Sequence, residues 1–301
     1  MDLNSEEIKK EKYLFILNPV SGDGRAIQEV EDVEKYCNKK GIDYKIEITK
    51  AIDDAENLVI ENPNYDIYVA VGGDGTINEV AAGILKKGEG ILGIIPRGTG
   101  NDLSKALELP LKLEECLDII TTKDYKLIDV GLADGKYFLN VASIGLDAEV
   151  VNQTEKIKDH VKGNKAYILG VFFALIKYKS KKSSIDINDK IYKNSLMLLA
   201  VGNGKYYGGG MKILPNASLN DNSLSFCMVK DISKLRVLTL FPTIFSGKHL
   251  KYERYVLEGK ADKIDVDFGG KITLNLDGKL YRLENNKINF KLHDKKLKIK
   301  Y

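Results

Sequence analysis

The sequence predicts two domains: a parallel α/β domain first, and then a mostly antiparallel, sandwich-like β domain. Three observations predict this architecture. The chain has 301 residues, and a single domain usually holds about 100–200. Short apolar runs alternate with helical patterns through residues 1–130, which is typical of a parallel sheet with helices on both faces. Residues 131–293 contain short strands separated by turn dipeptides, which is typical of antiparallel β structure.

The first domain is predicted to alternate strands and helices. Apolar or alternating runs predict strands at residues 13–17, 44–49, 65–71 and 91–95. Helices are predicted at residues 26–39 and 76–85, where apolar residues recur on one face. A further helix is expected after Asp53, because Glu56 stands three residues later, at the spacing of a capping box.

The second domain is predicted to be rich in strands. They are expected at residues 126–132, 137–141, 195–201, 224–229, 263–268, 272–276 and 287–292. The turn dipeptides Asp134-Gly135, Gly269-Gly270 and Asp277-Gly278 separate several of them. Helical patterns are confined to residues 155–178 and 232–245. The boundary between the domains should therefore fall near residue 130.

Composition and charge exclude several classes of protein. The net charge of +3 gives no basic field, and no zinc-finger or homeodomain spacing is present, so no nucleic-acid partner is expected. The cysteines, Cys37, Cys116 and Cys227, are odd in number and far apart. This favours buried thiols in a reducing compartment over a disulfide frame or a zinc site. The polar start, residues 1–11, lacks the apolar core of a secretory signal, so we expect a cytoplasmic protein.

Three glycine-rich loops each follow a predicted strand of the first domain. They are Asn18-Pro-Val-Ser-Gly22, Gly72-Gly-Asp-Gly-Thr76 and Pro96-Arg-Gly-Thr-Gly-Asn-Asp102. Parallel sheets bind ligands at the carboxyl ends of their strands, and glycine lets the backbone N–H groups approach a phosphate. A tight turn explains any one loop equally well, but three loops at one sheet edge favour a phosphate site. Neither the P-loop signature nor the complete dinucleotide fingerprint is present.

Two aspartates lie inside these loops, where a carboxylate would repel a phosphate. Asp74 and Asp102 can fit such a site in three ways: by binding Mg²⁺, by bracing the loops through N–H bonds, or by contacting ribose hydroxyls. The residues alone leave these alternatives open. The hydroxyls of Thr76 and Thr99, and the positive end of a helix expected from Thr76, add donors.

The order of the three loops resembles the diacylglycerol kinase catalytic-domain family, which includes bacterial soluble lipid kinases and is related to the sphingosine kinases. The resemblance continues through Ile128-Asp-Val-Gly131, residues 203–211, Pro215-Asn-Ala217 and Leu276-Asp-Gly278. It implies an ATP- and Mg²⁺-dependent kinase that transfers the γ-phosphoryl group to diacylglycerol or a similar lipid alcohol. It also implies a cleft between the domains and a last segment, residues 294–301, that returns to the first domain.

The resemblance further implies which residues form the site. ATP would be held by Asn18, Pro19, Ser21, Gly22, Thr49, Gly72, Gly73, Asp74, Gly75, Thr76, Asn78 and Thr99. Asp129 matches an aspartate tied to the catalytic Mg²⁺ through water, and Asp277 matches the proposed general base. Taken alone, Asp277 is better explained as a hairpin turn residue. A structural Mg²⁺ site would involve Asp221, Ser218 and Ser223.

Several residues depart from the family pattern. Lys279 stands where the family has Glu after Asp-Gly, Ser218 replaces an aspartate of the structural Mg²⁺ site, and Lys105 replaces an Arg. These departures keep open an altered activity or a catalytically idle lipid- or nucleotide-binding protein. An NAD kinase is the other alternative, since it shares Gly-Gly-Asp-Gly-Thr, but the other two loops argue against it.

A lipid kinase must reach a membrane, and one segment is suited to it. The apolar run at residues 166–176 is shorter than the roughly 20 residues of a spanning helix, and a basic cluster follows it at Lys177, Lys179, Lys181 and Lys182. Such a helix can dock on an anionic leaflet, which predicts peripheral contact at the inner membrane face. A core helix of the second domain is the favoured alternative, because its apolar residues run all round. A homodimer is compatible with the sequence.

Overall fold

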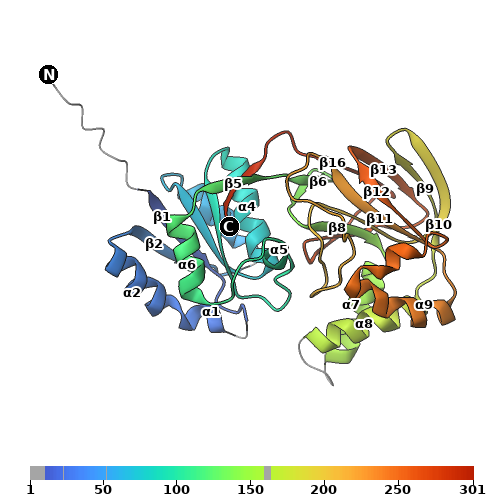
Figure 1. Ribbon diagram of the computed structural model, residues 1–301, viewed down its shortest axis with the longest axis horizontal. Helices are drawn as coiled ribbons and strands as arrows, with labels where there is room; N and C mark the ends of the chain where they lie inside the picture. The colour runs from blue at the N-terminus through green and yellow to red at the C-terminus, as the bar shows by residue number, and fades with distance from the viewer. Residues whose placement is uncertain (1–10, 23, 52, 159–163) are drawn as a thin grey trace.

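The computed structural model describes residues 11–22, 24–51, 53–158 and 164–301. Figure 1 shows two bodies side by side, one built on a parallel sheet and one on antiparallel strands. The predicted fold class is thereby confirmed. Within the described chain, no helix is long and apolar enough to cross a membrane.

The first sheet has the strand order β2-β1-β3-β4-β17-β5. Its strands are β1 (Lys12–Leu17), β2 (Asp43–Ile48), β3 (Ile67–Gly72), β4 (Ile91–Pro96), β5 (Tyr125–Ile128) and β17 (Leu297–Lys300). The first four are parallel and match the predicted runs. The end of the chain returns here, because β17 pairs in parallel with β4 and antiparallel with β5 (Figure 1).

Helices cover both faces of this sheet because successive strand residues point to opposite sides. They are α1 (Arg25–Gln28), α2 (Val30–Lys40), α3 (Asp54–Glu61), α4 (Asp74–Lys87), α5 (Asp102–Ala106) and α6 (Leu113–Thr122). Phe15 and Val69 pack in one core with α2 and α6. Leu14 and Ala70 pack in the other core with α3, α4 and α5.

Two helix predictions in this domain were wrong in detail. The helix expected at residues 26–39 is interrupted at Glu29, between α1 and α2. The capping box at Asp53 does not form, because Asp53 is left-handed, with φ 66°, and its side chain makes no cap bond. Its N–H group donates instead to Glu79 Oε1 on α4, at 3.1 Å.

The second sheet runs β15-β14-β8-β10-β9-β13-β16-β6-β7, and β11 pairs with both β10 and β12. Its strands are β6 (Gly131–Ala133), β7 (Lys136–Phe138), β8 (Val141–Gly145), β9 (Lys181–Ile187), β10 (Lys190–Gly202), β11 (Leu224–Lys230), β12 (Val256–Ala261), β13 (Lys263–Phe268), β14 (Thr273–Leu276), β15 (Lys279–Arg282) and β16 (Lys287–Leu292). The paired strands are antiparallel and curl around one apolar core.

Two of the predicted strands are each divided into two separate strands in the structure. The run at residues 126–132 is divided between β5 in the first sheet and β6 in the second. The run at residues 137–141 is divided between β7 and β8, because the N–H groups of Leu139, Asn140 and Val141 donate to the carboxylate of Asp277. The strands β9, β12 and β15 were not predicted.

Short helices cover one side of the second sheet. They are α7 (Asp147–Lys158), α8 (Asn164–Lys177), α9 (Lys234–Leu240) and the 3₁₀ turns η1 (Phe241–Ser246) and η2 (Lys248–Lys251). The single helix expected at residues 155–178 is thus represented by α7 and α8, and residues 159–163 lie outside the described residues. Val171 and Ala174 of α8 are buried in the apolar core beneath these helices, as the core-helix alternative predicts.

Candidate functional site

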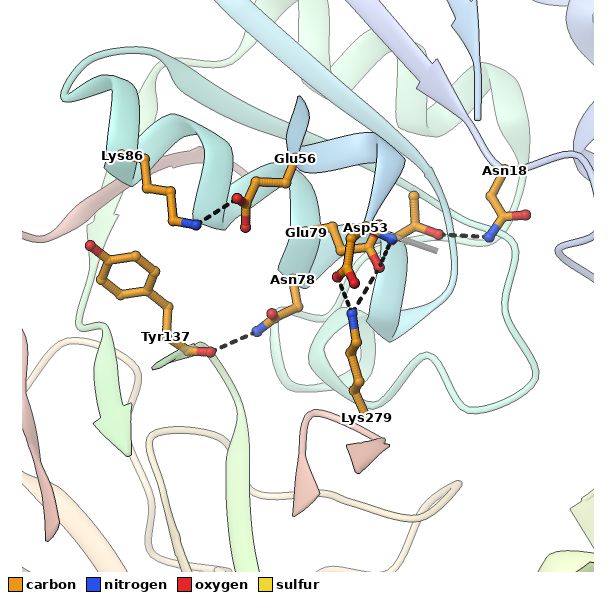
Figure 2. Close-up of polar contacts among 9 residues, drawn as sticks. Asn18, Asp53, Glu56, Asn78, Glu79, Lys86, Tyr137 and Lys279 are labelled. Atoms are coloured by element: carbon orange, nitrogen blue, oxygen red, sulfur yellow. Dashed lines mark hydrogen bonds and ion pairs between the residues drawn. The ribbon is translucent and has the colours of Figure 1, made fainter. Parts of the chain in front are cut away.

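The three glycine loops lie together at the carboxyl edge of the first sheet. Leu17 is in register with Val71, and Gly72 with Pro96, so β1, β3 and β4 end side by side. Asn18 Nδ2 donates to Thr76 Oγ1 at 3.1 Å, which joins the first loop to the second (Figure 2). Within the expected ATP set, this edge gathers Asn18, Pro19, Ser21, Gly22, Thr49, residues 72–76, Asn78 and Thr99.

Backbone contact between loops explains why glycine is needed here. A Cβ atom at Gly98 would lie 2.5 Å from Gly73 Cα, so any larger residue would force the second and third loops apart. Asn101 adopts φ 51° and accepts the N–H of Gly98 on its side-chain oxygen, at 2.8 Å. The two loops therefore form one packed floor.

Helix α4 starts from this floor and directs its positive end there. It begins at Asp74, two residues before the expected start, and no side chain caps it. The first N–H groups of a helix lack intrahelical partners, and the helix dipole favours an anion beside them. The edge can therefore hold phosphate groups.

Asp74 and Asp102 brace the loops by accepting backbone N–H groups. Asp74 Oδ1 accepts from Leu103 at 3.2 Å. Asp102 Oδ2 accepts from Gly209 of the second domain at 2.7 Å. Burial, with the charge of Asp102, raises the pKa of Asp74 to about 6, and burial raises the pKa of Asp102. Asp102 Oδ1 is buried without a hydrogen bond from the described residues, and Lys105 Nζ lies 3.6 Å from it.

This acidic pair fits a cation that would accompany nucleotide phosphates. Two neighbouring carboxylates with raised pKa values gain from a nearby positive charge, and Mg²⁺ prefers oxygen ligands. Asp102 Oδ1 accepts no hydrogen bond within the described residues and lies 3.6 Å from Lys105 Nζ, so a cation at this place would share the oxygen with that lysine. Bracing and cation binding are thus compatible roles for the same two residues.

Asp277 is fixed by hydrogen bonds from both domains. Its Oδ2 accepts from Leu139 N at 2.7 Å and Asn78 Nδ2 at 2.9 Å. Its Oδ1 accepts from Asn140 N at 3.1 Å and Val141 N at 2.9 Å. A carboxylate has about four lone-pair sites, so these donors occupy them all. Burial raises the pKa of Asp277, although the donors act in the opposite direction.

Lys279 follows the same turn and also reaches the first domain. Its ammonium pairs with Asp53 and with Glu79, the latter at 3.3 Å (Figure 2). Although Lys279 lies on a hairpin, its charge is therefore paired across the domains. Neither of these two acidic partners was predicted from the sequence.

Asp129 lies where the chain crosses between the two sheets. It is only 3% exposed, and its Oδ1 contacts Lys296 Nζ at 2.8 Å while its Oδ2 accepts from Asn222 N at 2.8 Å. The structure therefore places its carboxylate with the loop at residues 219–222. Its link to a catalytic Mg²⁺ stays a prediction.

The expected structural Mg²⁺ site has a lysine in it. Lys260 pairs with Asp221, Ser218 Oγ donates to Asn220 at 3.3 Å, and Ser223 follows in the same loop. No cluster of three or more His, Cys, Asp or Glu side chains suited to a metal occurs among the described residues. Divalent cations need several oxygen ligands, and here Asp221 offers one carboxylate, whose Oδ2 is paired with Lys260 and whose Oδ1 is buried without a hydrogen bond from the described residues. The structural Mg²⁺ site stays a prediction.

The fold and this edge define a kinase of the lipid or nucleotide type. Residues 12–133 match the family model of the diacylglycerol kinase catalytic domain, and residues 140–283 match the YegS C-terminal NAD kinase beta sandwich-like domain. The chain is 30% identical over 288 residues to a diacylglycerol kinase of Staphylococcus saprophyticus, covering 94% of each chain. It is 30% identical to one of Staphylococcus aureus over 94% of this chain and 91% of that one. The chain belongs to the diacylglycerol kinase family.

Solved structures agree with this assignment. A Bacillus anthracis structure superposes with a TM-score of 0.80 at 26% identity, over 97% of both chains. An NAD kinase from Archaeoglobus fulgidus, solved in complex with ATP, has a TM-score of 0.53 at 13% identity and covers 96% of this chain and 93% of its own. The second likeness shows the shared fold.

Proposed function

We propose that this kinase transfers the γ-phosphoryl group of ATP to the hydroxyl of diacylglycerol or a closely similar lipid alcohol. The observation that carries the proposal is an apolar cavity of about 80 Å³ in the second domain, beneath α8 and α9. Tyr207 and Met211 line the cavity, and Gly209 between them donates to Asp102 at the glycine-loop edge. One short segment thus joins the nucleotide edge to a small apolar cavity, which is well below the roughly 300–1,000 Å³ of a small-molecule site and has room for only part of an acyl chain.

The cavity supports a lipid over NAD as the acceptor. Its lining comes from apolar side chains such as Leu146, Val171 and Val237, with His249 and two tyrosines as its polar members. Acyl chains gain free energy from leaving water for such a surface, whereas a nicotinamide dinucleotide would need polar partners.

The two domains would divide the work of the reaction. The glycine loops and the first turn of α4 would hold the phosphates of ATP, and Asp74 and Asp102 would hold a Mg²⁺ ion, which would supply positive charge to neutralise the phosphates. On the acceptor side, Asp277 accepts the proton of the lipid hydroxyl. Because the four lone-pair sites of Asp277 are occupied, the hydroxyl must displace one donor. Asn78 is the only side-chain donor among them, and a side chain can rotate away.

Contact with a membrane would bring the substrate to the cavity. On α8, Leu169 is 39% exposed and Phe173 is 41% exposed, although their neighbours Val171 and Ala174 are buried. Exposed lysines follow at residues 177–182, and each adds roughly 1 kcal/mol beside an anionic leaflet. We propose peripheral binding through this surface at the inner membrane face.

Transfer of label from γ-labelled ATP with Mg²⁺ tests the function, with diacylglycerol, sphingosine, polyprenol and NAD as acceptors. Label on one lipid alcohol supports the proposal, and label on NAD alone refutes it. Val237→Phe fills the cavity with an apolar side chain and should lower transfer to lipid while ATP binding persists. Leu235→Phe is the matched control, since Leu235 is on the same helix but 74% exposed.

A further inference from the structure

Two neighbouring residues of α4 contact two residues of the β14–β15 hairpin. Asn78 donates to Asp277, and Glu79 pairs with Lys279. Figure 2 shows Asn78 and Glu79 on α4 with Lys279 approaching from the second domain. The hairpin turn is therefore fastened to one helix of the other domain at two consecutive positions.

The contact at Lys279 is a network of three charged groups. Lys279 is 24% exposed and Glu79 15% exposed, while Asp53 is 66% exposed. The N–H of Asp53 also donates to Glu79 Oε1, so each member contacts both others. Burial alone would lower the pKa of Lys279, but its hydrogen bond to Asp53 and the neighbouring charges hold it above its usual range. The Lys279 ammonium therefore stays charged and paired with the carboxylates of Asp53 and Glu79.

The first turn of α4 also belongs to the proposed phosphate-binding edge. The ion-pair network therefore links that edge to the hairpin that carries Asp277. Thr76 lies in the first turn of α4 and contacts Asn18 of the first glycine loop. Glu79 follows three residues later, which is about 4.5 Å along a helix axis. A shift at Glu79 therefore moves the phosphate-binding turn relative to Asp277.

We infer that Lys279 is a positioning residue, whose ion pair with Asp53 and Glu79 sets the separation between the phosphate-binding turn of α4 and the acceptor-side hairpin. The kinetic part of this inference rests on the proposed function. Reacting atoms must come within about 3–3.5 Å, and misplacement by 1 Å can reduce the rate about 10²-fold. An exposed ion pair with no such role would contribute little to folding and nothing to turnover.

Reversing the charge of Lys279, and then restoring the ion pair with a second substitution, distinguishes a positioning role from that of a surface ion pair that affects folding alone. Lys279→Glu places a third negative charge beside Asp53 and Glu79, and should lower kcat about 10²-fold with little change in KM for ATP. Lys279→Glu combined with Glu79→Lys restores the attraction and should recover most of kcat. The matched control is Lys287→Glu, which reverses a lysine 74% exposed and 4.0 Å from Asp267 within the second domain. It should leave kcat unchanged.

Hydrogen exchange measures the same contact without any acceptor. The amides of Leu139, Asn140 and Val141 donate to Asp277, so loosening the hairpin should speed their exchange in Lys279→Glu and not in the compensated variant. Unchanged exchange and kcat in Lys279→Glu would overturn the inference, and so would a failure of Glu79→Lys to restore either. If the wild type phosphorylates no lipid, the proposed function fails, and the exchange result still decides whether the network positions the hairpin.

Discussion

Replacing Asp277 by asparagine tests whether the hydrogen bonds of this one carboxylate stabilise the contact between the two domains. Asparagine keeps one acceptor oxygen and puts an NH₂ group where the other oxygen was. Two of the present donors, which lie 2.7 to 3.1 Å from the carboxylate, then face a donor. The change is nearly isosteric, so packing is conserved and only hydrogen bonding and charge differ.

The expected magnitude follows from the donors left unpaired. Each buried donor without an acceptor costs about 1–3 kcal/mol, so two cost about 2–6 kcal/mol. Part of this loss is offset, because burial raises the pKa of Asp277 and asparagine carries no charge to desolvate. We therefore expect the lower end of that range, which is a large share of the roughly 5–15 kcal/mol that stabilises a domain.

Urea unfolding at pH 7 without nucleotide measures the effect. Asp277→Asn should lower the midpoint without changing the slope. Asp134→Asn is the matched control, because Asp134 also precedes glycine in a turn with φ 51° but is exposed. Equal stability of Asp277→Asn and the wild type, within about 0.5 kcal/mol, would refute the reasoning. If Asp277 is also the base, kcat falls about 10²–10⁴-fold while ATP still binds.

Three further changes test other parts of the site. Burial raises the pKa of Asp74 to about 6 from 3.8, so its contribution to folding stability is full below pH 3.8 and is lost as the pH rises through 6. Without cations at pH 7, Asp74→Asn should therefore have a free energy of unfolding up to about 3 kcal/mol higher than that of the wild type. At low pH the two proteins should be equally stable. Ser218→Asp with Lys260→Gln should gain a larger Mg²⁺-dependent rise in Tm than the wild type shows, and equal rises contradict this. Gly98→Ala, whose Cβ would lie 2.5 Å from the neighbouring loop, should destabilise the fold by about 1–3 kcal/mol and weaken ATP binding in calorimetry. Gly75→Ala, which lies in the first turn of α4 with open space around its Cβ, should not lower stability.

The strands β1, β3 and β4 of the first sheet were predictable because they are short, buried and locally apolar. The strand at residues 67–72 is buried throughout, and such runs need no distant partner to be recognised. The glycine loops were predictable for the same reason, since each follows its strand directly, and the parallel arrangement brings them together. Sequence also suggested the acidic pair at Asp74 and Asp102, and bracing of the loops through backbone N–H groups was one of the three alternatives it left open.

The failures arise where distant residues decide the local structure. The apolar run at residues 126–132 continues smoothly while the chain changes sheets, and no local pattern marks that crossing. The break between β7 and β8 depends on a carboxylate 136 residues or more away. Strand β9 was missed because it begins within the basic cluster that follows the apolar run at residues 166–176. The partners of Lys279 lie 200 and 226 residues earlier in the chain, beyond the reach of pattern or spacing.

The replacement of the family's glutamate by Lys279 therefore changes a contact between the domains. A glutamate at this position would face Asp53 and Glu79 as a third negative charge, whereas the lysine is paired with both. The proposed base, Asp277, lies two residues before it and keeps its full set of hydrogen bonds. Lysine here is thus matched to acids of the first domain and leaves the carboxylate of the turn in place. The ion pair thus explains how a lysine is accommodated at this position, and transfer of label to a lipid is the measurement that decides against the catalytically idle alternative.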